Sequence, residues 1–299
     1  MRPEIRPLVC KSALSRVNGM HFRWSLSPYR GCEHACWYCY ARETHTYFDL
    51  NGGRDFERII FAKTNVAEQL GREMRSRTWK HEEVAVGTAT DPYQPIEGRL
   101  RLTQACLKEF AATATPLSII TKSTMVRRDI DLLVDAATKG GVHVTVSIPI
   151  ADPHLARRIE PGVPPPEARF GAVRALADAG LNVGVNLAPI IPGLTDTEGN
   201  IGAVLRLAGE HGARQVGAMV MHLKPAPRAW FMAQVRCWFP QLEAYYASVY
   251  APGQAYAPSD LTSDIERSVD QLRMRYPLPE FTDAPIGPPP RPQQLALLI

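Results

Sequence analysis

Short β-branched runs alternate with amphipathic helical stretches from residue 80 onward, and this alternation limits the possible folds more than any other sequence feature. The runs are short enough for buried strands and lie at residues 84–87, 117–121, 142–148, 183–187 and 216–220, with an earlier candidate at 22–26. Helical patterns lie between the later runs, at residues 103–114, 129–138, 167–179 and 195–211. Strands separated by helices pair in parallel, so the pattern predicts an α/β fold, a partial (β/α)6 TIM-type barrel. A doubly wound sheet gives nearly the same pattern, but no G-x-G-x-x-G follows any of these runs.

Glycines and a capping pattern mark the expected helix ends. Gly140, Gly180 and Gly212 each follow a helical pattern and precede a strand, where a left-handed residue is expected. Thr195 and Glu198 form a T-x-x-E capping box, which predicts a helix start.

The chain is expected to divide into a core and peripheral segments. We expect an N-terminal arm over residues 1–20, the core barrel over 21–226, a C-terminal helical extension over 227–276 and a proline-rich tail over 277–299. Pro225 and Pro227 are expected to break the chain before the helices of the extension, which are predicted at residues 230–239, 242–250 and 260–275. The tail is expected to be extended or disordered, because its prolines favour neither helix nor sheet.

Charge and hydropathy leave the class of ligand open. The 34 basic and 30 acidic side chains give a net charge of +4, which neither requires nor excludes nucleic acid. The N-terminal residues contain no apolar run that could serve as a signal peptide or a membrane span. We therefore expect a cytoplasmic protein with no membrane partner, in a compartment that keeps its six cysteines reduced.

Three of those cysteines, Cys32, Cys36 and Cys39, form a C-x3-C-x2-C cluster directly after the first candidate strand. Three thiolates on a short loop can cover one face of a cubane iron–sulfur cluster and leave the fourth iron without a protein ligand. A structural zinc site completed by His34 or His45 is the alternative from another functional class. A closed ferredoxin-type cluster would need a fourth ligand nearby.

The wider segment Y-R-G-C-E-H-A-C-W-Y-C-Y-A-R, with the aromatic Tyr38 before the last cysteine, resembles the radical S-adenosylmethionine (SAM) superfamily. Together with T-D-P-Y-Q-P at Thr90 to Pro95, it resembles the spore photoproduct lyase-like branch over roughly residues 20–226. The resemblance implies a [4Fe–4S] cluster on Cys32, Cys36 and Cys39, SAM bound at the open iron, and an external one-electron reductant of flavodoxin or ferredoxin type. It also implies reductive cleavage of SAM to a 5′-deoxyadenosyl radical that abstracts hydrogen from a substrate, whose identity the sequence does not give.

The resemblance places the methionyl end of SAM near the second strand's end, where Thr88, Thr90 and Asp91 replace a G-G-E-like segment. Asp91 has a simpler alternative role as the cap of an Asp-Pro turn, and Tyr38 has one as a core aromatic. The polar residues at the other strand ends are Lys122, Ser123, Ser147, Asn186, His222 and Lys224. Lys122 and Ser147 are the cofactor-binding candidates of this set, whereas apolar neighbours favour core hydrogen bonding for Asn186 and His222.

The remaining cysteines bear on the substrate. Cys106 and Cys237 are expected in the core, and Cys10 is expected to be a surface thiol of the arm, with a position over the barrel mouth as the alternative. Spore photoproduct lyase uses a cysteine as hydrogen donor, and no cysteine lies between Cys39 and Cys106, so that repair reaction is not expected. The basic segment at residues 71–80 is expected to be a solvated face, with phosphate contact, and hence nucleic-acid modification, as the alternative.

Overall fold

The computed structural model describes residues 3–20 and 22–278, and its centre is a seven-stranded sheet in the order β10-β9-β8-β7-β6-β3-β2. Its strands are β2 (Leu14–Arg16), β3 (Trp24–Leu26), β6 (Val84–Val86), β7 (Leu117–Thr121), β8 (Val142–Ser147), β9 (Asn182–Ile190) and β10 (Gln215–Val220). All neighbours from β3 to β10 pair in parallel, and β2 adds to β3 in antiparallel fashion. The predicted partial barrel is confirmed, and in the described part of the chain β10 and β2 are the sheet's two edges, so the barrel is open.

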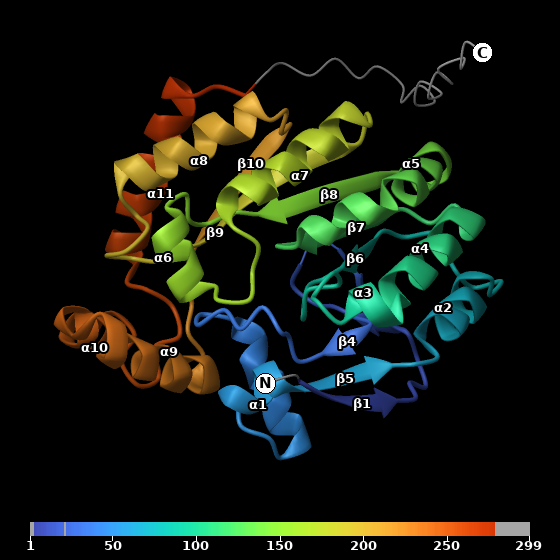
Figure 1. Cartoon of the computed structure of the whole chain (residues 1–299), viewed down its shortest axis with the longest axis horizontal. Coiled ribbons are helices and arrows are strands. Elements are labelled where there is room, and N and C mark those ends of the chain that lie inside the picture. The colour runs from blue at the N-terminus through green and yellow to red at the C-terminus, as the bar shows by residue number, and fades with distance from the viewer. Residues whose placement is uncertain (1–2, 21, 279–299) are drawn as a thin grey trace, which may run out of the picture.

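Helices cover the outer side of this sheet in an arc (Figure 1). They are α2 (Val66–Met74), α4 (Leu102–Thr113), α5 (Ile130–Lys139), α7 (Pro166–Asp178) and α8 (Glu198–Glu210). Ile119, Val144 and Val183 of neighbouring strands are fully buried beneath them. The parallel sheet is thus covered by its crossover helices, as βαβ connections require.

A second, three-stranded sheet in the order β1-β5-β4 was not predicted. It consists of β1 (Glu4–Leu8), β5 (Ile59–Lys63) and β4 (Tyr29–Arg30), and β4 leads directly into the cysteine segment. The 3-10 helix η1 (Tyr40–Phe48) and the short helix α1 (Arg54–Arg58) connect that segment to β5. This small sheet therefore fixes both ends of the segment that contains the three clustered cysteines.

The remaining helices connect strands or follow the barrel. The short connecting elements are α3 (Glu97–Leu100), the 3-10 helix η2 (Thr124–Asp129) and α6 (Pro153–Ile159). After the last strand come α9 (Pro225–Trp238), the 3-10 helix η3 (Pro240–Leu242), α10 (Glu243–Val249) and α11 (Ser259–Arg275). Residues 279–299, which include most of the predicted tail, lie outside the described residues. In the described residues, we find no helix with the length and apolar character that a membrane span requires.

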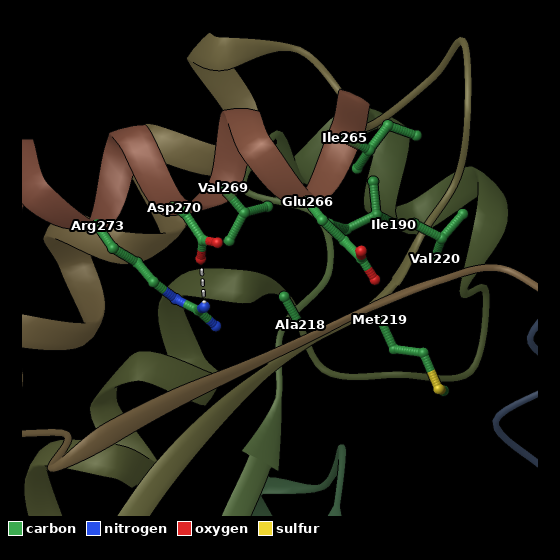
Figure 2. Close-up of a pocket in the computed structure, with 9 residues that line it drawn as sticks. All are labelled: Ile190, Ala218, Met219, Val220, Ile265, Glu266, Val269, Asp270 and Arg273. Atoms are coloured by element: carbon green, nitrogen blue, oxygen red, sulfur yellow. Dashed lines mark hydrogen bonds and ion pairs between the residues drawn. The ribbon is translucent and has the colours of Figure 1, made fainter. Parts of the chain in front are cut away.

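Helix α11 lies across the exposed side of β10, where Ile190, Val220, Ile265 and Val269 line a small pocket (Figure 2). Arg273 closes one end of this pocket by donating to the carbonyl oxygen of Val216, at 2.8 Å. This contact protects part of an edge strand that carries no charged residue of its own.

Three local predictions are wrong. Pro225 and Pro227 do not break the chain but lie in the first turn of α9, where proline removes only an N–H that has no helical partner. The helix predicted from Thr195 is capped instead by Thr197, whose hydroxyl accepts from the Asn200 backbone N–H, while the Thr195 hydroxyl accepts from that of Ile191.

The third concerns a helix C-terminus. Gly180 and Gly212 have the expected positive φ, but Gly140 does not, and Gly141 adopts that conformation instead. The left-handed turn before β8 is thus displaced by one residue from the predicted position.

Candidate iron–sulfur and SAM site

A cavity of about 440 Å³ lies at the carboxyl ends of the parallel strands, and the thiols of the cysteine segment line it. Its described lining residues include Cys32, Cys36, Cys39, Tyr38, Tyr40, Thr88, Thr90, Asp91, Lys122, Ser147, Asn186 and His222. They come from the cysteine segment, from β9 and from the ends of β6, β7, β8 and β10, and this edge of a parallel barrel is where active sites form. The structure thus brings together all nine cofactor- and metal-binding candidates predicted from the sequence.

The backbone of the cysteine segment is held in one conformation. Gly31 has a φ of +81°, and a Cβ there would approach the carbonyl oxygen of Ile59 to 2.6 Å, so only glycine fits. The Cys32 N–H donates to the carbonyl of Phe56 at 2.9 Å, and the Trp37 N–H donates to that of Ile159 at 3.1 Å. Cys32 and Cys36 are buried and Cys39 is partly exposed.

The fully buried side chain of Arg42 supports the cysteine segment. Its Nε and one terminal nitrogen donate to the carbonyl oxygen of Cys36, at 3.0 and 2.8 Å. The guanidinium also donates to the carbonyls of Gly52 and Gly53 and forms an ion pair with Glu57 at 2.6 Å. The planar five-donor geometry of arginine is what allows one side chain to tie the cysteine segment to the turn before α1.

The T-D-P-Y-Q-P segment supports the same loop from the other side. The Gln94 amide donates to the carbonyl of Gly31 and accepts from the backbone N–H of Glu33, both at 3.0 Å. The Glu33 carboxylate accepts from the N–H of Ile96 at 2.6 Å. The two sequence segments that carry the family resemblance are therefore one structural unit.

Asp91 is fully engaged within the protein. One carboxylate oxygen accepts from the Tyr93 N–H and the Thr121 hydroxyl, and the other accepts from the Lys122 N–H and contacts His34 Nδ1 at 3.3 Å. Burial opposes ionisation of Asp91, but His34 and these hydrogen bonds outweigh it and hold the pKa of the carboxyl below its ordinary value. The turn-cap interpretation is supported by the Tyr93 contact, and the side chain also joins the strand end to the cysteine loop.

Tyr38 belongs to a buried polar network. Its hydroxyl donates to Glu160, which forms a fully buried ion pair with Arg169 at 2.8 Å, and Arg169 donates to the carbonyl of Ser147. Burial raises the pKa of Tyr38 well above its ordinary value, and the negative charge of Glu160 raises it further. The side chain thus packs as a core aromatic and links the cysteine loop to the end of β8.

Of the other strand-end residues, Thr90 and Ser123 use their hydroxyls in hydrogen bonds within the protein, whereas Lys122 and Thr88 line the cavity. The amine of Lys122 lies 5.6 Å from the centre of the Tyr38 ring at the cavity wall. The Thr90 hydroxyl donates to the carbonyl of Tyr29, which leaves Thr88 as the half-buried hydroxyl at this strand end. The Ser123 hydroxyl caps η2.

Asn186 and His222 differ from the prediction, because both are only half-buried and line the cavity. The sequence neighbours of both are apolar, but Asn186 lies on the face of β9 that lines the cavity and His222 follows the end of β10.

The cysteines outside the cluster lie away from the cavity. Cys106 is buried in α4, as predicted, but Cys237 is exposed, so that prediction is wrong. The Cys10 thiol contacts the side-chain oxygen of Asn65 at 3.3 Å, beside the start of α2. The Cys10 thiol therefore lies away from the mouth of the barrel.

The positions of the His, Cys, Asp and Glu side chains can be compared with what a zinc ion and an iron–sulfur cluster each require. His34 contacts Asp91 through Nδ1, and His45 Nε2 lies 3.0 Å from the carbonyl oxygen of Ile59. Within residues 3–20 and 22–278, no three His, Cys, Asp or Glu side chains surround one point as a single zinc ion requires. Three thiols that share a cavity fit a cubane, because each binds a different iron. Burial raises the pKa values of the Cys32 and Cys36 thiols, so metal loading would release their protons.

Residues 26–201 match the family model of the radical SAM superfamily. The chain belongs to this superfamily. An uncharacterised protein of Mycobacterium tuberculosis is 40% identical over 291 residues, which cover 94% of this chain and 85% of the relative. An uncharacterised protein of Methanocaldococcus jannaschii is 32% identical over 199 residues, covering 67% of this chain and 72% of the relative.

Solved structures of spore photoproduct lyase share the fold. A mutant with bound AdoMet and dinucleoside spore photoproduct aligns with a TM-score of 0.64 and 16% identity, over 91% of this chain and 79% of that chain. Another mutant of the same enzyme aligns with a TM-score of 0.65. At this identity the likeness establishes the fold, which agrees with the prediction from the two sequence segments.

Proposed function

We propose that this protein is a radical SAM enzyme that holds a [4Fe–4S] cluster on Cys32, Cys36 and Cys39. The main support is that these three thiols lie on one loop and line one cavity at the strand ends. The residues predicted to contact SAM line the same cavity. Bound there, the cluster and SAM would supply one-electron cleavage of a carbon–sulfur bond and a primary carbon radical for hydrogen abstraction.

The chain's own residues have three tasks in this proposal. Arg42 and Gln94 fix the loop backbone, so the thiols are positioned before metal binds. Thr88 and Lys122 are the polar groups best placed to contact SAM, with Ser147 at the next strand end. Thr90, Asp91 and Tyr38 form the adjoining wall, and their own hydrogen-bonding atoms already have protein partners.

Apolar side chains would protect the reaction from water. Phe22, Ile120, Pro189, Ala218 and Met221 line the cavity between its polar groups. Such surroundings exclude solvent from the site and so limit side reactions of a reactive intermediate.

The alternatives receive less support. Arg72 and Arg75 in the basic segment pair with Glu68 and Glu109, which favours the solvated-face interpretation over phosphate contact. The reductant, of flavodoxin or ferredoxin type, and a reducing cytoplasmic location remain predictions that follow from the proposed cluster.

Metal analysis of protein purified without oxygen tests the cluster directly. We expect about four iron and four sulfide per chain after reconstitution, and little iron in the variant with alanine at Cys32, Cys36 and Cys39. Cys237→Ala is the matched control, because this thiol is exposed and lies outside the cavity. One equivalent of zinc without iron in the anaerobic protein would contradict the proposal and favour a zinc-stabilised binding module.

A further inference from the structure

Large apolar side chains are exposed together at the opening of the cavity. Of the eight that are exposed in the described residues, Met20, Tyr40 and Met219 line the cavity, and Tyr256 stacks on a residue that lines it. Figure 2 shows the Met219 side chain pointing away from α11, although Met219 also lines the small pocket beside that helix. Single exposed apolar residues are ordinary, but a group of them at one opening marks a binding surface.

Two rings of this group, Tyr40 and Tyr256, form a column with the ring of His222. The ring of His222 lies between Tyr40 and Tyr256, with centroid distances of 5.7 and 5.5 Å and interplanar angles of 30° and 26°. The three residues come from the start of η1, the segment after β10 and the segment before α11. We call Tyr40, His222 and Tyr256 the aromatic column.

The rings of the aromatic column are held in place by hydrogen bonds. The Tyr40 hydroxyl donates to the carbonyl of Thr88, which ties the first ring to the end of β6. His222 and Tyr256 are backbone partners in a bridge, and the Leu223 N–H donates to the carbonyl of Ala255 at 2.7 Å. Such a preformed surface loses little conformational entropy when a flat ligand adds to it. Tyr256 ends the column outside the cavity with 71% of its surface exposed.

Charge narrows the class of ligand. Aromatic faces also attract cations, but Lys122 lines the cavity and Lys224 follows the column's His222 by two residues. Asp91 is the only carboxylate among the described lining residues, and both its oxygens are occupied by protein donors. The opening therefore disfavours a cationic ligand and accepts a neutral or anionic one.

We propose that the aromatic column binds a planar aromatic ring of neutral or negative charge, presented by the substrate. The ring stacks on Tyr256, and the rest of the molecule extends past His222 and Tyr40 into the cavity. That this ligand is the substrate rests on the proposed function. A nucleobase and an indole share the required chemistry, and the experiment separates them.

Ligand-observed NMR on the full-length protein tests the proposal with two probes, uridine 5′-monophosphate and N-acetyltryptophanamide. We expect at least one to bind with millimolar or tighter affinity, and Tyr256→Leu to weaken that binding about tenfold, as loss of one stacking partner does. Tyr256→Phe retains the ring and should bind as the wild type does. Tyr47→Leu is the matched control, since Tyr47 is 75% exposed but does not line the cavity.

Four results would overturn the inference: neither probe binds, Tyr47→Leu weakens binding as much as Tyr256→Leu, a cyclohexyl analogue binds equally well, or S-adenosylhomocysteine displaces the probe. The last result would assign the column to the cofactor's adenine. Iron loading of the same preparations is measured separately, so failure of the proposed function and failure of ring binding are distinguishable.

Discussion

Replacing Arg42 tests how the cysteine loop is held. In Arg42→Met, the carbonyls of Cys36, Gly52 and Gly53 lose their donors, and Glu57 loses its ion-pair partner. An unsatisfied buried acceptor costs about 1–3 kcal/mol. Gly53 and Glu57 are partly exposed and can regain water, so the lower end of that range applies. With about 1 kcal/mol for each of these two groups and about 1–3 kcal/mol for each of the buried carbonyls of Cys36 and Gly52, we expect the free energy of unfolding of the iron-free protein to fall by about 4–8 kcal/mol.

Arg42→Lys should cost about half as much, because a lysine ammonium keeps the charge but cannot make the paired contact with the Cys36 carbonyl. Urea unfolding of the iron-free variants measures both costs. Anaerobic reconstitution then measures iron per chain, which we expect to fall severalfold in Arg42→Met, since the thiols are no longer positioned.

Arg128→Met provides the matched control. Arg128 pairs with Glu97 and Asp129 at 2.8 and 2.7 Å but makes no hydrogen bond with residues 32–39 among those described. The Arg128→Met variant should be less stable than the wild type and yet load iron as the wild type does. Equal iron loading in Arg42→Met and the wild type, or an equal loss in Arg128→Met, would refute a specific role for Arg42.

Three further changes have defined expected outcomes. Gly31→Ala should abolish iron loading while a secondary-structure spectrum persists, because its Cβ would lie 2.6 Å from the Ile59 carbonyl oxygen; normal loading would contradict the loop geometry. Tyr38→Phe should lower the free energy of unfolding by about 1–2 kcal/mol and leave SAM cleavage within a few fold, and a much larger loss of cleavage would mean that the hydroxyl acts on SAM. Burial lowers the pKa of His143, so the unfolded state binds more protons and the free energy of unfolding falls as pH drops below about 6.5. His143→Gln should reduce that slope in urea titrations at several pH values, and an unchanged slope would exclude His143 as a source.

The barrel could be predicted because its signals are local. Strand β7 has the predicted bounds, and the helices of the barrel lie within a few residues of their predicted ones, since buried runs and amphipathic faces depend on nearby sequence alone. The three-stranded sheet was missed for the opposite reason. Strand β1 contains Pro7 and is stabilised by β5, whose residues begin at Ile59, and β4 has only two residues.

The thiols of the candidate site could be predicted from spacing, but their support could not. Arg42 stands three residues beyond Cys39, the last of the predicted cluster ligands, and nothing in its type indicates full burial. Cys237 was misplaced because its neighbours are apolar. It lies two residues, or about 200° around α9, from the buried Val235 and therefore faces outward.

Formation of 5′-deoxyadenosine tests the central claim most directly. Reconstituted protein, reduced with dithionite in the presence of SAM and without oxygen, is predicted to release 5′-deoxyadenosine and methionine. The variant with alanine at Cys32, Cys36 and Cys39 should release neither, while Cys237→Ala should match the wild type. Loaded wild-type protein that yields no 5′-deoxyadenosine, or equal yield from the triple variant, would contradict the account.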